Sequence, residues 1–143
     1  MSRRVDIVSG DRATHHHGMA DPRQLRGREA EDAAAAYLAR AGLAVVDRNV
    51  RFRAGELDLV CRDGARWVFV EVKARRADWG DAPGAAVAWW KQRRIVRLAQ
   101  LYLKARGLGE PPCRFDVVAV TASDDGRLEV RHVPAAFDAT GMV

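Results

Sequence analysis

Residues 55–73 read GELDLVCRDGARWVFVEVK, with one apolar run on each side of Asp63-Gly64. An Asp-Gly pair between two apolar runs is a common signal for a tight turn between antiparallel strands. The second run, from Trp67 to Val72, is apolar except for Glu71, which is typical of a strand that is buried on both faces. This stretch therefore predicts a β-hairpin in the middle of a sheet.

Charged side chains occur within both strands of the predicted hairpin. Because side chains alternate along a strand, Glu71 and Lys73 share a face of the second strand. By the same rule, Glu56 and Asp58 share a face of the first strand. Pairing around the turn can therefore bring Asp58 beside Glu71 and Lys73. A carboxylate in such a place must be paired, hydrogen-bonded or bound to a metal.

The number of acids separates two interpretations of this cluster. A structural ion pair with Lys73 needs only one carboxylate, whereas the hairpin offers both Asp58 and Glu71. Glu56 is a third candidate. Carboxylate oxygens suit Mg²⁺ or Mn²⁺, and such a site requires no His or Cys. Charge inside a core often marks a functional site, so we favour a metal site and keep the structural ion pair as the alternative.

At these residues the chain resembles known proteins. Asp58 followed by Glu71-Val72-Lys73 is similar to the D…(D/E)xK signature of the restriction-endonuclease-like nucleases. The wider pattern resembles the bacterial YraN family, whose members are largely uncharacterised and look like archaeal Holliday-junction resolvases. It covers roughly residues 23 to 133 and comprises Gly27…Glu31, Gly55 to Leu59, Phe69 to Lys73 and Arg114 to Val118.

The resemblance implies a metal-dependent endonuclease that hydrolyses phosphodiester bonds in DNA, including branched recombination or repair intermediates. Asp58, Glu71 and the carbonyl of Val72 would hold Mg²⁺ or Mn²⁺. Glu31 would reach the metal through water, although the helix dipole alone could explain an acid there. Glu56 would support the site, and Lys73 would orient the attacking water and stabilise charge on the phosphate.

Partners follow from the same resemblance. It favours branched or duplex DNA, leaves RNA open, and raises the expectation of a homodimer. The alternative function is a catalytically inactive nucleic-acid-binding module that retains the nuclease fold. An intact set of Asp58, Glu71 and Lys73 argues against that alternative.

The composition fits a nucleic-acid enzyme. The 143 residues carry a net charge of +5 with a pI of about 9.9, and nearly all of the basic charge is arginine, which favours bidentate contact with phosphate. No apolar run is long enough for a membrane span, and the N-terminus does not resemble a signal peptide. The two cysteines suggest neither a disulfide framework nor a zinc site. We therefore expect a cytoplasmic protein of one domain.

The element order predicts one α/β domain. We expect a disordered tail over residues 1–20, a nuclease-like domain over 21–137 and a short tail over 138–143. Within the domain we expect a helix from Asp21 to about Arg40, three strands from Leu43 onward, a helix over Gly84 to Arg106, and strands over Arg114 to Thr121 and Arg127 to Val133. The order α-β-β-β-α-β-β predicts a mixed central sheet flanked by helices, as in the restriction-endonuclease-like core.

Basic residues near the hairpin are candidates for nucleic-acid binding. Ala74 to Pro83 reads as a loop beside the site. Lys91 falls inside the apolar stripe of the second helix, so it should point towards the carboxylates unless it reaches out to solvent. The candidate contacts are Arg75, Arg76, Lys91, Gln92 and Arg94. Trp89 and Trp90 could pack under a loop, contact DNA or form a dimer seam.

Overall fold

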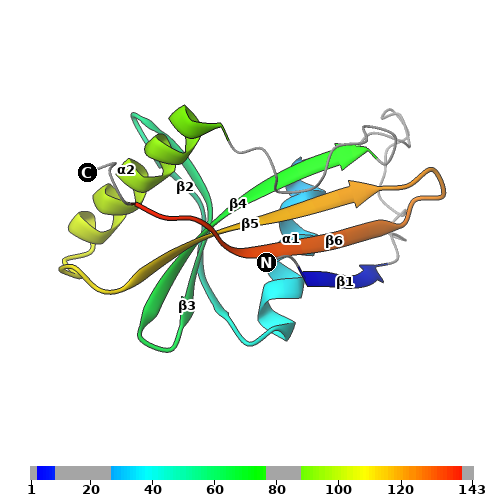
Figure 1. Ribbon diagram of the computed structural model, residues 1–143, viewed down its shortest axis with the longest axis horizontal. Helices are drawn as coiled ribbons and strands as arrows, with labels where there is room; N and C mark the ends of the chain where they lie inside the picture. The colour runs from blue at the N-terminus through cyan, green and yellow to red at the C-terminus, as the bar shows by residue number, and fades with distance from the viewer. Residues whose placement is uncertain (1–2, 9–26, 77–87, 140–143) are drawn as a thin grey trace.

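The computed structural model describes residues 3–8, 27–76 and 88–139 (Figure 1). The elements are β1 (Arg3–Val8), α1 (Gly27–Arg40), β2 (Ala44–Phe52), β3 (Gly55–Asp63), β4 (Arg66–Arg76), α2 (Trp89–Ala105), β5 (Cys113–Ala122) and β6 (Leu128–Phe137). The strands form one sheet in the order β1-β6-β5-β4-β3-β2. Because β4 and β5 are parallel and the other neighbours are antiparallel, the sheet is mixed. From α1 onward, the predicted element order is confirmed.

The central hairpin forms where the sequence predicted it. β3 and β4 pair from Asp63↔Arg66 back to Leu59↔Val70. Gly64 lies in the turn with a φ of 64°, a conformation that glycine adopts without a steric cost. The apolar part of β4, from Trp67 to Val70, is buried throughout. The strand is therefore covered on both faces, as expected.

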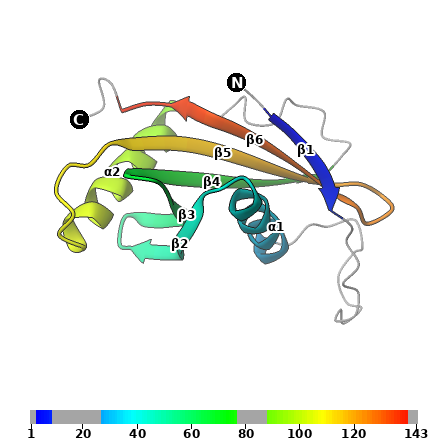
Figure 2. The same ribbon diagram turned by 90° about the horizontal axis from the view of Figure 1, so that it is seen from below.

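Two separate apolar clusters lie on the two faces of the sheet. Val68, Val70 and Val118 belong to the cluster that includes the buried side of α1. Phe69 and Phe115, which alternate with them, belong to the cluster that includes the buried side of α2. Figure 2 shows α1 lying against the sheet below β4 and β5. Glu71 and Lys73 follow Phe69 by two and four positions, so they lie on the α2 face.

The N-terminal segment contains a strand, which corrects the prediction of a disordered tail over residues 1–20. β1 pairs antiparallel with β6, from Arg3↔His132 to Val8↔Leu128. β6 therefore lies inside the sheet, between β1 and β5. The backbone N–H and C=O groups along that edge of β6 are open to pairing with another strand. β1 contains β-branched residues, which favour an extended strand. The rest of the tail, residues 9–20, and the predicted helix start at Asp21 lie outside the described residues.

The second helix and the strand before it also differ from the prediction. β4 continues through Arg76, so Ala74 does not begin a loop. Its parallel pairing with β5 extends to Arg76↔Ala122, and this pairing supplies the backbone partners that keep the chain extended. α2 begins at Trp89, and residues 77–87 lie outside the described residues. Within the parts of the chain that the structure describes, neither helix is long and apolar enough to cross a membrane.

Candidate active site at the fork of β3 and β4

The candidate site lies at the fork of β3 and β4, which is the place beyond Leu59 and Val70 where the two strands no longer pair. Their register ends at Leu59↔Val70, and in Figure 1 the two strands diverge near the centre of the view. Beyond this point the backbone N–H of Val72 donates to Oδ2 of Asp58 at 2.8 Å. The carboxylate thus takes the place of a main-chain acceptor just after the strands part. This bond fixes the orientation of Asp58 at the mouth of the fork.

Several carboxylates act on one another at the fork. The pKa of Asp58 is raised from 3.8 to about 7, first because burial disfavours its charged form and then because Glu71 is negatively charged. Glu31 on α1 and Glu56 on β3 add to this increase, whereas the hydrogen bond from Val72 opposes it. The acids predicted from the sequence therefore share one electrostatic environment. Such an environment favours a bound cation.

One cation at this site comes from α2. The Nζ atom of Lys91 lies 2.8 Å from Oε2 of Glu71, and the two side chains are 34% and 11% exposed. The expectation that Lys91 points from its helix towards the carboxylates is confirmed. Because Glu71 is the more buried partner, the ion pair is shielded from solvent on the side of the sheet.

The remaining predicted residues are also placed at or near the fork. Lys73 is half-buried on the same face of β4 as Glu71, where its backbone is in register with Ala119. Glu56 is half-buried, and its Oε1 lies 3.7 Å from Nε of Arg51. Glu31 is half-buried on the first turns of α1.

The donor chemistry fits a hard divalent cation. Asp58 and Glu71 supply carboxylate oxygens, and the negative charge of Glu71 adds to the effect of burial in raising the pKa of Asp58. Within the described residues, no group of three or more His, Cys, Asp or Glu side chains is arranged around one point as a metal cage. A cation held here would therefore rest on two carboxylates with water or backbone oxygen completing its shell, an arrangement that Mg²⁺ commonly adopts.

The predicted nucleic-acid contacts are not all at the surface. Arg75 lies within β4 and is only 8% exposed, which leaves it little surface to offer to a phosphate. Arg76 is the last residue of β4, and its side chain is outside the described set. Gln92 is half-buried. Arg94 is exposed, and its guanidinium carbon lies 5.3 Å from the ring centroid of Trp90.

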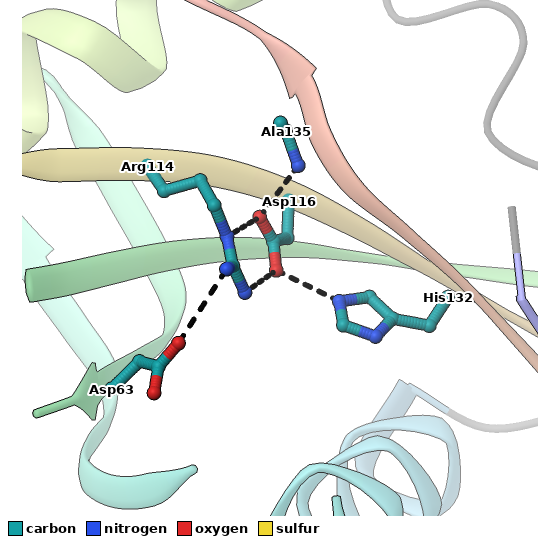
Figure 3. Close-up of polar contacts among 5 residues, drawn as sticks. All are labelled: Asp63, Arg114, Asp116, His132 and Ala135. Carbon is teal, nitrogen blue, oxygen red and sulfur yellow. Dashed lines mark hydrogen bonds and ion pairs between the residues drawn. The ribbon is translucent and has the colours of Figure 1, made fainter. Parts of the chain in front are cut away.

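A second charged cluster, on the other face of the sheet, was not predicted (Figure 3). Asp116 is fully buried and accepts bonds from Nε and Nη2 of Arg114 at 2.8 and 2.9 Å, from Nε2 of His132 at 2.7 Å and from the backbone of Ala135 at 2.9 Å. The ring of His132 packs edge-on against Tyr37 of α1, at 5.4 Å between centroids. The cluster therefore faces α1.

The environment of Asp116 indicates a structural role. Burial alone would raise its pKa, but the hydrogen bonds from His132, Arg114 and the backbone hold that pKa below its ordinary value. Asp116 alternates with Phe115, which packs on the α2 side, so it lies on the face opposite Glu71. Asp116 therefore pairs structurally and lies away from the candidate active site. The contribution of His132 carried no sequence signal, because it depends on the register of β5 with β6.

The architecture and the acidic fork define an α/β protein with a restriction-endonuclease-like core. A match to the uncharacterised protein family UPF0102 spans residues 30–120, which include the fork and α2. The chain therefore belongs to this family, which is the YraN family that the sequence resembled.

Relatives align over most of their length. A UPF0102 protein of Symbiobacterium thermophilum is 52% identical over 79% of this chain and 96% of its own. UPF0102 proteins of Anaeromyxobacter dehalogenans and Dechloromonas aromatica are 49% and 52% identical, over 87% and 82% of this chain and 92% and 95% of theirs.

Proposed function

We propose that this protein is a metal-dependent endonuclease that hydrolyses phosphodiester bonds in DNA at the fork of β3 and β4. One observation carries the proposal: two acidic strand residues meet where the strands part, with a lysine on the same face. Asp58 is fixed there by the N–H of Val72, and Glu71 lies on β4 with Lys73 two positions further on. A structural ion pair would require only one of these acids.

The residues divide the expected work among them. Asp58 and Glu71 would hold Mg²⁺ or Mn²⁺, with the carbonyl of Val72 as a further ligand and Glu31 acting through water. The bound metal would supply charge stabilisation and an activated water. Lys73 would orient that water and stabilise charge on the phosphate. An ordinary lysine is protonated at neutral pH, so positioning suits it better than proton removal.

The charge of the chain supports a polyanionic substrate. A net charge of +5 favours association with nucleic acid, while the acids at the fork repel phosphate unless a cation lies between them. Metal would therefore serve both chemistry and docking. On this proposal, DNA approaches the fork most readily once the metal is bound.

Cleavage assays with matched variants test the proposal. Wild type should cleave at least one of a branched, a duplex or a single-stranded DNA when Mn²⁺ is added, and EDTA should stop the reaction. Asp58→Asn and Glu71→Gln should each reduce cleavage by orders of magnitude. Glu110→Gln changes an exposed acid beyond the far end of α2 and should leave cleavage unchanged. Equal cleavage by wild type and both site variants would trace the activity to a contaminant and reject the proposal.

The ion pair between Lys91 and Glu71 favours a second candidate, a nucleic-acid-binding module without catalysis. In that case the ammonium group permanently supplies the positive charge that a metal supplies in a nuclease. Metal titration separates the two candidates. A wild-type protein that binds DNA but whose melting temperature does not respond to Mn²⁺ or Mg²⁺ would favour the module.

A further inference from the structure

Two indole rings at the first turn of α2 are largely open to solvent. Trp89 and Trp90 are 58% and 62% exposed, whereas Trp67 in the sheet is 6% exposed. Among the described residues, the next most exposed large apolar side chains are Val46 at 37% and Leu108 at 36%. Adjacent exposed indoles are unusual on a folded surface unless they bind something.

Each indole is accompanied by an arginine one helical turn further on. The guanidinium carbon of Arg93 lies 4.8 Å from the ring centroid of Trp89, and that of Arg94 lies 5.3 Å from the ring centroid of Trp90. The spacing of four residues is the one that brings side chains together on a helix. In each pair the guanidinium lies over one face of the indole, so a base would stack on the opposite face. A nucleotide can use both groups, because its base stacks on an aromatic ring and its phosphate pairs with a cation.

The indoles share the first turn of α2 with Lys91, which contacts the acidic fork. Lys91 follows Trp90 in the chain and contacts Glu71 through its Nζ atom. Because a helix rises about 1.5 Å per residue, both indoles begin within about 3 Å of Lys91 along the axis of α2. Successive residues are about 100° apart around a helix, so Trp90 points sideways from Lys91 and Trp89 points nearly opposite to it. A strand stacked on these rings would therefore pass the same helical turn that carries the ion pair between Lys91 and Glu71.

We propose that Trp89 and Trp90 stack against unpaired bases, so that the DNA cleaved at the fork carries single-stranded nucleotides beside the reacting phosphate. The cleavage part of this inference rests on the proposed function. Inside a duplex each base face is covered by its neighbours, so only single strands, flaps and opened junctions present free faces for stacking. A protein partner could also cover the rings, but an arginine at each ring and a net charge of +5 favour a polyanion.

Binding measured without metal tests the stacking. The probes are fluorescein-labelled oligo(dT) and a blunt duplex of equal length, titrated with the full chain in EDTA and followed by fluorescence anisotropy. The double variant Trp89→Ala/Trp90→Ala should weaken oligo(dT) binding at least about fivefold and duplex binding by less than about twofold, because phosphate contacts carry the latter. Trp89→Phe/Trp90→Phe should restore much of the loss. Val46→Ala trims an exposed apolar side chain on β2 and should change neither affinity.

Three results would overturn the inference: equal weakening on both probes, no weakening on oligo(dT), or a wild type that binds neither probe. A wild-type dimer that the double alanine variant converts to a monomer in sedimentation would also overturn it, in favour of a dimer seam. The nuclease proposal fails separately. Absent Mn²⁺-dependent cleavage with intact indole-dependent binding rejects only the nuclease, whereas metal-dependent cleavage of blunt duplex that the double variant retains rejects only the stacking.

Discussion

Nζ of Lys91 lies 2.8 Å from Oε2 of Glu71, so the first turn of α2 contributes a cation to a carboxylate in the middle of β4. This contact joins the helix to the sheet at the place where β3 and β4 part. A metal bound at Glu71 would bring a second positive charge close to the ammonium group of Lys91. Lys91 and a metal at Glu71 should therefore oppose each other, because both are attracted by the same carboxylate.

Replacing Lys91 with Met should reveal this opposition. Without metal, Glu71 loses its cation, and the free energy of unfolding should fall by about 1–3 kcal/mol, between the values for exposed and buried pairs. The affinity for Mn²⁺ should rise, because no ammonium competes for the carboxylate. Chemical denaturation and calorimetric Mn²⁺ titration measure the two effects. Lys104→Met, at the exposed end of α2, is the control and should change neither.

The pKa of Asp58 predicts how stability depends on pH in EDTA. Its folded value of about 7 lies above the ordinary value of 3.8, so the folded state binds more protons than the unfolded state between these values. Stability should therefore fall as pH rises from about 4 to 7, and then level off. Asp58→Asn should remove this decline and melt at a higher temperature than wild type at pH 8. If the melting temperatures of wild type and variant change with pH in the same way across this range, the assignment is contradicted.

The sequence was sufficient for the hairpin and for the direction of Lys91, because both depend on local periodicity. Alternation along β4 and the Asp63-Gly64 signal define the paired strands, and the helical period places Lys91 on the apolar side of α2. The family resemblance added Glu31. Glu31 and Asp58 lie on different elements, so local periodicity could not predict that they are close. Its electrostatic effect on Asp58 supports that placement.

Contacts between distant segments could not be predicted. β1 is short, and its pairing with β6 depends on an edge formed at the other end of the chain. The bond from His132 to Asp116 depends on the register of β5 with β6, which shifts between Phe115 and Val117. Arg75 was assigned to a loop because nothing in its local sequence shows that β5 extends far enough to pair with it.

The buried cluster around Asp116 should support stability and not metal binding. Asp116→Asn leaves Arg114 and His132 without their shared anion, so the free energy of unfolding should fall by about 3–5 kcal/mol at neutral pH. The lowered pKa of Asp116 means that its stabilisation is present above about pH 4 and is lost as pH falls further. The variant should therefore approach wild type in acid. Asp124→Asn, in the exposed turn before β6, is the control and should leave stability unchanged. If Asp116→Asn stays folded but loses affinity for Mn²⁺, the two faces of the sheet are coupled and the prediction is wrong.

Metal binding should release a proton from Asp58. A metal binds the charged carboxylate, whereas at about pH 6 this group with a pKa of about 7 is mostly protonated in the free protein. Calorimetric titrations of Mn²⁺ in buffers with different ionisation enthalpies count the protons released. We expect nearly one proton per metal at about pH 6 and almost none at about pH 8.5. Asp58→Asn should abolish this difference, whereas Glu110→Gln should retain it. Tight Mn²⁺ binding with no proton release at either pH would show that the metal binds away from Asp58. The active site would then also lie away from Asp58.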